Sequence, residues 1–112
     1  MWYHIFIYEV IIREVFILRS LFDSLRKISK KFNIKGVYLF GSYAKGTDNK
    51  DSDIDVAIIL DSDANTFDLM LELMMLTQNI DLRIEPHPIK ENDFEEGNPF
   101  VEEIKTTGFK VA

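Results

Sequence analysis

Hydrophobic positions recur with a helical period in the stretch that begins at Ser20. Basic residues occupy the positions between them, which is the pattern of an amphipathic helix with one apolar face. The apolar positions are Leu21, Leu25, Ile28 and Phe32. Residues 33–36 are typical of a helix break, and the apolar run Val37–Phe40 then predicts a strand.

A second apolar run predicts another strand from about Asp53 to Leu60. It carries two acids at its start and is apolar on both faces beyond them, which predicts a central place in a sheet. After a turn-rich connection, Asn65 is expected to cap a helix from Phe67 to about Gln78. The stripe expected to be buried on this helix is Leu69, Leu73 and Leu76, broadened by Met70, Met74 and Met75.

Apolar and charged residues then alternate from Ile80 to Glu85, which predicts a third strand. On that strand Asp81, Arg83 and Glu85 would share one face. The following Pro86-His87-Pro88 is expected to be a stiff, extended connection, because each proline fixes its own φ and restricts the residue before it. The acidic run 91–96 is expected to be exposed.

The last predicted helix runs from Pro99 to Thr107, with Asn98 as its cap and Gly108 just past its end. Phe100 and Ile104 would dock it. The fold class expected from these elements is a mixed α/β (α+β) domain with a small, partly antiparallel twisted sheet of about three to five strands. Helices would pack on one face of the sheet, with the acids exposed on the other.

The first eighteen residues are unusually apolar, but Glu9, Arg13 and Glu14 interrupt the run before it reaches the ~20 residues that a membrane span needs. The segment also lacks the basic start and cleavage site of a signal peptide. We expect residues 1–19 to be either a helical extension or a segment outside the domain proper. In the second case it is an added packing or oligomer surface, or the product of an upstream start assignment. Residues 20–112 would form the domain.

The chain's 112 residues suit one domain of ordinary globular composition. Its lack of cysteine fits a reducing, cytoplasmic setting. Charge is unevenly divided: residues 1–50 carry nine Lys/Arg against four Asp/Glu, and residues 51–112 carry four against fifteen. An acidic half argues against direct nucleic-acid binding, which depends on a basic surface. It favours a basic protein partner instead.

Candidate chemistry lies between the first two predicted strands. Asp53 and Asp55 would project to the same strand face, with Cα atoms roughly 6 to 7 Å apart. Gly41 allows a sharp turn, and Ser42 offers a hydroxyl and N–H groups to anionic oxygens. Because Mg²⁺ commonly bridges protein carboxylates to substrate phosphates, the pattern suggests a nucleoside triphosphate bound for displacement at phosphorus.

Each half of this pattern has an ordinary structural explanation. A Gly-Ser pair is usually a turn, and an Asp-x-Asp is usually a solvated loop. Their combination is less easily explained, because two acids at the start of an apolar strand are costly to bury without a charge partner.

The stretch GSYAKGTDNKDSDID resembles the signature of the minimal nucleotidyltransferases of the DNA polymerase beta superfamily, in which Gly-Ser is followed by ten residues and then Asp-x-Asp. The resemblance covers about residues 20–112 and implies that family's fold. It implies a third carboxylate on a later strand, for which Asp81 matches the family pattern, while Glu85 on the same predicted face stays a competitor. It also places Lys45 where the family has a basic residue; this side chain would either contact the triphosphate or be an inert surface lysine. Ser52, at the end of the polar loop before Asp53, would add a hydroxyl beside the metal site.

The resemblance implies transfer of AMP from ATP, with Mg²⁺, most simply two ions, held by Asp53, Asp55 and Asp81. Minimal chains of this kind are typically antitoxins that adenylylate a tyrosine of a HEPN ribonuclease toxin. A 112-residue chain leaves no room for an acceptor domain, so the acceptor site is expected on a partner. Two alternatives stay open: an antitoxin that neutralises by binding alone, and a free-standing transferase acting on a small molecule or RNA end. His4 and His87 show no metal-binding spacing and are not expected in the site.

Overall fold

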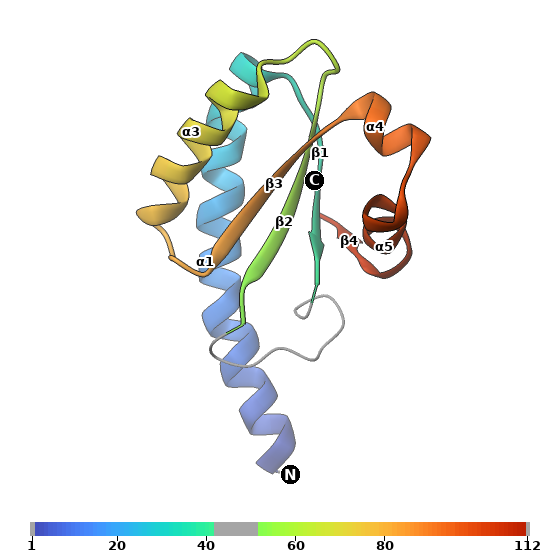
Figure 1. Ribbon diagram of the computed structural model, residues 1–112. Helices are drawn as coiled ribbons and strands as arrows, with labels where there is room; N and C mark the ends of the chain where they lie inside the picture. The colour runs from blue at the N-terminus through green and yellow to red at the C-terminus, as the bar shows by residue number, and fades with distance from the viewer. Residues whose placement is uncertain (1, 42–51, 112) are drawn as a thin grey trace.

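The structure is a computed structural model that describes residues 2–41 and 52–111, with residues 2–14 described by the course of their backbone (Figure 1). The helices and strands are, in chain order, α1 (Trp2–Phe32), β1 (Ile34–Phe40), β2 (Ile54–Leu60), α3 (Thr66–Gln78), β3 (Ile84–Lys90), α4 (Glu91–Glu96), α5 (Pro99–Thr107) and β4 (Phe109–Lys110).

The four strands form one mixed sheet in the order β3-β2-β1-β4. β1 runs antiparallel to β2 and β4, whereas β2 and β3 are parallel. The expected mixed α/β class is confirmed, as is the central position of β2. The first strand is longer than expected, because Ile34 already pairs with Leu60 across the sheet.

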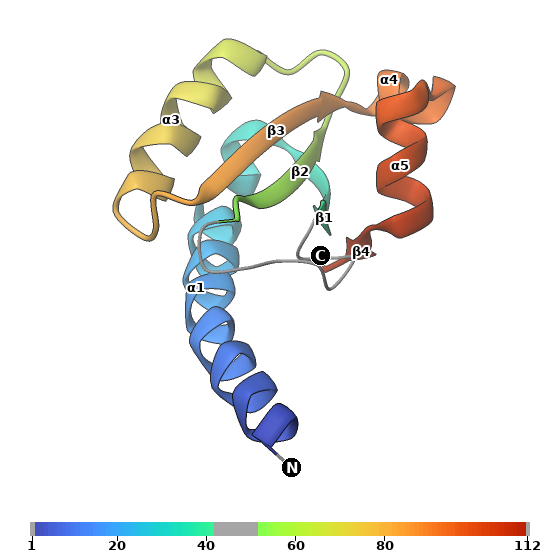
Figure 2. The ribbon, with the colours of Figure 1, turned by 60° about the horizontal axis from the view of Figure 1, so that its bottom comes forward.

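Side chains alternate along β2 between two hydrophobic clusters. The cluster under α1 and α3 includes Ile54, Val56, Ile58, Leu60, Leu21, Leu25, Leu69 and Leu73. The second cluster, on the other side of the sheet, joins Ile104 of α5 to Phe40, Ala57, Ile59 and Ile89. Figure 2 shows α3 and α5 on opposite sides of β3. The expectation that helices cover only one face is therefore wrong: α5 covers part of the second.

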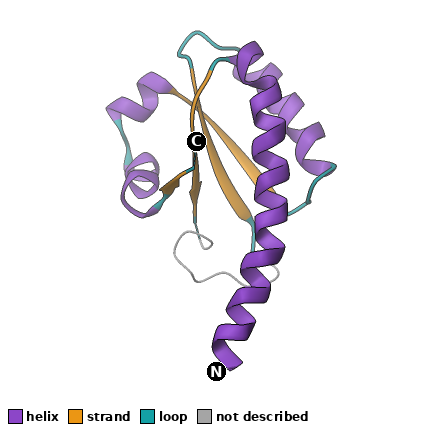
Figure 3. Ribbon diagram, turned by 180° about the vertical axis from the view of Figure 1, so that it is seen from behind, coloured by secondary structure: helices purple, strands orange, loops and turns teal. Residues whose placement is uncertain are grey.

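α1 is one continuous helix of 31 residues, so the apolar N-terminal stretch and the predicted amphipathic helix form a single element. Its C-terminal half lies across the sheet, and its N-terminal part extends beyond it (Figure 3). No helix in the described part of the chain is long and apolar enough to cross a membrane. A boundary between extension and domain near residue 19 stays a prediction.

α3 begins as its sequence predicts, because the Asn65 side chain accepts hydrogen bonds from the N–H groups of Phe67 and Asp68 at 3.1 and 3.2 Å. Leu69 and Leu73 are fully buried. The expectation that Met74 and Met75 broaden the buried stripe is wrong, since they are 45% and 70% exposed. They lie on the outward side of the helix, together with the exposed Phe67 and Leu71.

The third strand differs most from its prediction. The N–H groups of Ile80 and Asp81 bond to the carbonyl of Thr77, which prolongs the end of α3 as a turn, and β3 starts only at Ile84. The predicted connection 86–88 lies inside β3. Prolines two residues apart direct their nitrogens to the same side of a strand, and β3 is an edge strand, where a missing N–H is tolerated.

The C-terminal part of the chain agrees better with its prediction. The Asn98 side chain accepts a hydrogen bond from the N–H of Val101 at 2.9 Å, and α5 spans the predicted residues. Ile104 is buried as expected, but Phe100 is 41% exposed and Val101 takes the second buried position. The acidic run 91–96 forms the short helix α4.

Candidate active site

Three strand ends meet where β1 finishes and β2 and β3 begin. In the sheet register Asp55 lies opposite Phe40 of β1 on one side and Glu85 of β3 on the other. Asp55 shares its strand face with Ala57, whose partner on β3 is His87. The register therefore gathers Asp55, Glu85 and His87 at one end of the second face.

Their side chains are within reach of a common ligand. His87 Nε2 lies 3.1 Å from Asp55 Oδ1 and 3.9 Å from Glu85 Oε1. One ligand atom from each residue falls within 4.8 Å of the other two. Asp55 and His87 are mostly covered, with side chains 22% and 26% exposed, whereas that of Glu85 is 53% exposed.

Asp53 completes a group of acids. It is exposed and directly precedes β2, whose first N–H, that of Ile54, bonds to the Arg83 carbonyl at 2.7 Å. Burial raises the pKa of the Glu85 carboxyl, and a side-chain hydrogen bond with Asp53 and the charge of Asp55 raise it further. A carboxyl whose pKa is raised by neighbouring carboxylates is a favourable setting for a divalent cation, which offsets the repulsion between them.

Gly41 follows β1 directly and can be no other residue without strain. Its φ of +76° lies in the left-handed region, and a Cβ there would come within 2.3 Å of Asp55 Oδ2. The expected sharp turn is present, and the group that it approaches is the Asp55 carboxylate. One oxygen of Asp55 thus faces the Gly41 backbone while the other faces His87.

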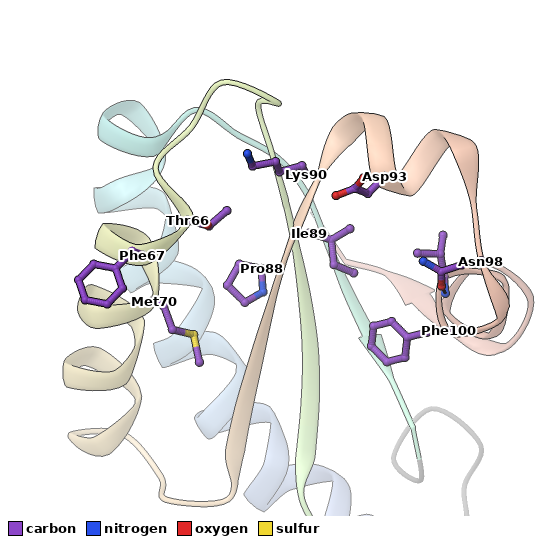
Figure 4. Close-up of a pocket in the computed structure, with 10 residues that line it drawn as sticks. Thr66, Phe67, Met70, Pro88, Ile89, Lys90, Asp93, Asn98 and Phe100 are labelled. Atoms are coloured by element: carbon purple, nitrogen blue, oxygen red, sulfur yellow. Dashed lines mark hydrogen bonds between the residues drawn. The ribbon is translucent and has the colours of Figure 1, made fainter.

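An aromatic group supports the histidine. The His87 ring packs against Phe40 and Phe100 with ring centroids 5.1 and 5.7 Å apart, and Phe40 and Phe100 meet edge to face at 5.5 Å. Phe100 also lines a groove of about 660 Å³ beside the open edge of β3, together with Phe67, Met70 and Pro88 (Figure 4). Phe100 therefore lies between His87 and this groove.

The family model described as polymerase beta, nucleotidyltransferase, matches residues 23–108. The chain belongs to this nucleotidyltransferase family. Two solved structures are similar to it. A toxin–antitoxin crystal structure with AMP-PNP has 22% identity and a TM-score of 0.61 over 82% of this chain and 69% of that one. A candidate nucleotidyltransferase from Sulfolobus solfataricus has 20% identity and a TM-score of 0.60 over 89% and 83%. At these identities the likeness shows the fold. No curated protein matches the chain.

Within this nucleotidyltransferase domain, Asp81 does not lie where its prediction put it. It sits in the turn before β3, where its carboxylate accepts hydrogen bonds from the N–H of Arg83 at 2.8 Å and pairs with the guanidinium at 3.0 Å. The hydrogen bond from the Arg83 side chain holds the pKa of the Asp81 carboxyl below its usual range. The expectation that Asp81 and Glu85 share a strand face is wrong, because Asp81 lies in the turn after α3 and only Glu85 lies in β3.

The prediction that His87 lies outside the site is wrong, because its ring contacts Asp55. The sequence did not indicate this, since the distance along the chain from Asp53 and Asp55 to His87 matches no metal-binding spacing. Only the parallel register of β2 and β3 brings it to Asp55. The available signal is the Glu-x-His alternation, which places both side chains on one face once residues 84–90 are taken as a strand. Ser42 and Lys45 lie outside the described residues, and the half-buried Ser52 directly precedes Asp53.

Proposed function

We propose that this domain transfers AMP from ATP to an acceptor hydroxyl. The observation that carries the proposal is the convergence of Asp53, Asp55 and Glu85 at one end of the sheet, beside the turn at Gly41, in a chain of the nucleotidyltransferase family. In the reaction the acceptor oxygen forms a bond to the α-phosphorus, the bond from that phosphorus to the bridging oxygen breaks, and pyrophosphate leaves.

The acids have separate tasks in this proposal. Asp53 and Asp55 would hold Mg²⁺, most simply two ions, and the bound cations supply neutralisation of the triphosphate charge. Glu85 takes the place that the sequence suggested for Asp81. Its carboxylate accepts the proton of the acceptor hydroxyl, a task that a raised pKa suits. Gly41, Ser42 and Lys45 would seat the triphosphate.

The acceptor in this proposal is a protein, most specifically a tyrosine of a cognate HEPN ribonuclease toxin. The fold likeness to a toxin–antitoxin structure with AMP-PNP supports an antitoxin role. So does the exposed apolar stripe on α3, formed by Phe67, Leu71, Met74 and Met75, which offers a partner a contact surface. The same stripe would serve an antitoxin that acts by binding alone.

The test is to identify a HEPN toxin among the products of the neighbouring genes, incubate the domain with ATP, Mg²⁺ and that protein, and measure the masses of the products. We expect a gain of ~329 Da per AMP transferred, from the loss of pyrophosphate. The double variant Asp53→Asn, Asp55→Asn should bind the toxin and leave it unmodified and active. Full neutralisation by this variant, with no mass added by the wild type, would establish the binding-only function instead.

A further inference from the structure

The Asp55 carboxylate is held from two sides, and its two oxygens face different groups. Oδ1 lies 3.1 Å from His87 Nε2. Oδ2 lies on the Gly41 side, 2.3 Å from the place a Cβ of residue 41 would take. Since Gly41 opens the segment proposed to seat the triphosphate, Oδ2 is the oxygen best placed for a cation shared with the nucleotide.

We propose that His87 is a positioning residue, whose Nε2–H donates to Asp55 Oδ1 and so turns Oδ2 toward the Gly41 backbone. The inference rests on the proposed function in one respect, because it takes a cation-bound nucleotide as the ligand of Asp55. The positioning itself depends on three features of the fold, namely the hydrogen bond, the glycine and the ring contacts of His87.

A carboxylate needs such a partner because its terminal torsion is broad and has no single preferred angle. Side chains that hydrogen-bond to metal-binding carboxylates orient them, and removing such a partner typically weakens metal binding about 10- to 100-fold. In a site that collects three acids, orientation also decides which oxygens repel one another. His87 Nε2 lies within hydrogen-bond distance of Asp55 Oδ1 and can act as that partner.

The ring is in turn held against rotation. Phe40 and Phe100 pack on it from β1 and α5, at 63° and 49° to its plane. Phe40 on β1 is the sheet partner of Asp55, and β3 holds His87 in register on the other side of β2. A histidine with these neighbours can keep one nitrogen directed at Asp55 Oδ1.

Glu85 does not compete for this nitrogen. Its Oε1 is 3.9 Å from His87 Nε2, beyond hydrogen-bond length, while the distance to Asp55 is 3.1 Å. The hydrogen bond therefore restrains Asp55, whereas Glu85 feels only the charge of His87, which lowers its pKa. A His87 substitution should change the orientation of Asp55 and not that of Glu85.

The experiment uses the whole chain and Mn²⁺ as the probe, with binding followed by electron paramagnetic resonance without nucleotide. His87→Phe keeps a ring between Phe40 and Phe100 but has no donor, and should weaken Mn²⁺ binding about 10- to 100-fold. His87→Gln places an amide N–H near the position of Nε2 and should restore most of the affinity. His87→Leu is a second donor-free variant, should the phenylalanine variant fail to fold.

The outcomes separate the two proposals. Wild-type affinity in His87→Phe or His87→Leu overturns the positioning role, and so does equal weakening in His87→Gln and His87→Phe. A nitrogen coupling to Mn²⁺ in pulsed spectra of the wild type would make His87 a direct ligand, which also overturns it. If the wild type binds Mn²⁺ with these variant effects but transfers no AMP, the positioning role stands and the transferase function falls. A wild type that binds no Mn²⁺ removes both.

Discussion

The two faces of the sheet differ in the side chains that β2 contributes to them. On one face of β2, Ile54, Val56, Ile58 and Leu60 are each at most 1% exposed beneath α1 and α3. On the other face, Ala57 and Ile59 are also buried, at 0% and 4% exposure, but the first position is Asp55, which contacts His87 and Gly41. The candidate site is therefore confined to one end of one face.

The difference shows where stability and function are separated in this fold. Each fully buried aliphatic side chain on the first face stabilises the fold by about 1.5 to 3 kcal/mol relative to exposure. At the end of the second face, burial raises the pKa of the Glu85 carboxyl, and the neighbouring acids Asp53 and Asp55 raise it further. Local conflict of this kind is expected at functional sites and is offset elsewhere in the core.

The largest expected effect is on the first face. Leu73→Ala removes a fully buried side chain between α3 and the sheet and should lower the free energy of unfolding by about 2 to 5 kcal/mol. Leu71→Ala, on the exposed side of the same helix, is the matched control and should change it by less than about 0.5 kcal/mol. Chemical denaturation measures both. Similar losses in the two variants would contradict the assignment of the buried side of α3.

Asp55→Asn should have the opposite effect to Leu73→Ala, lowering activity without lowering stability. We expect a loss of transfer rate of about 10²- to 10³-fold, the usual scale for one charge-stabilising group, with unchanged or increased stability because one of the crowded charges is gone. Steady-state transfer and thermal melting check the two halves. Asp63→Asn, in the exposed turn after β2, is the control and should alter neither.

Gly41→Ala should disturb both properties by a smaller amount. A non-glycine residue in a left-handed conformation costs roughly 1 to 3 kcal/mol, and the added Cβ would press on Asp55 Oδ2. Because the two residues are in contact, the activity losses of Gly41→Ala and Asp55→Asn should not be additive. A double-mutant cycle tests this, and strictly additive losses would show that Gly41 acts without Asp55.

The smallest effects should have opposite signs for two acids near the start of β3. The pKa of Asp81 is lowered in the fold, so its ionised form adds stability above pH 3.8, and this is lost as the pH falls through its lowered value. The pKa of Glu85 is raised from 4.5, so stability is lost as it ionises with rising pH. At pH 7, without added metal, Asp81→Asn should therefore destabilise and Glu85→Gln should stabilise. Melting curves from pH 3 to 7 would contradict this if both variants shifted the same way.

Much of the fold can be read from short stretches, because the signals are local. Asn65 and Asn98 cap the helices that follow them, since a side-chain oxygen needs only a neighbouring N–H. Gly41 marks the turn after β1, and the apolar run of β2 marks a central strand. Asp53 and Asp55 can be located in the same way, because they belong to a pattern that spans only fifteen residues.

The exposure of Met74 and Met75 could not be read in this way. The sequence predicts that Leu69 and Leu73 are buried, but it does not show how far the buried face extends around a helix that is apolar on two sides. That extent depends on the packing of Leu69 and Leu73 against β2 and α1, contacts between residues far apart in the chain.

The sequence by itself determined the pairing of a glycine turn with two acids, the class of fold and the places where two helices begin. Tertiary structure alone decided which acid and which histidine join them. Hydrogen bonds to Thr77 prolong the end of α3, so β3 begins at Ile84 rather than Ile80. The parallel register then places Glu85 opposite Asp55, with His87 two residues on, whereas Asp81 stays in the turn with Arg83. Strand register depends on pairing between distant segments, which no local pattern of residues contains.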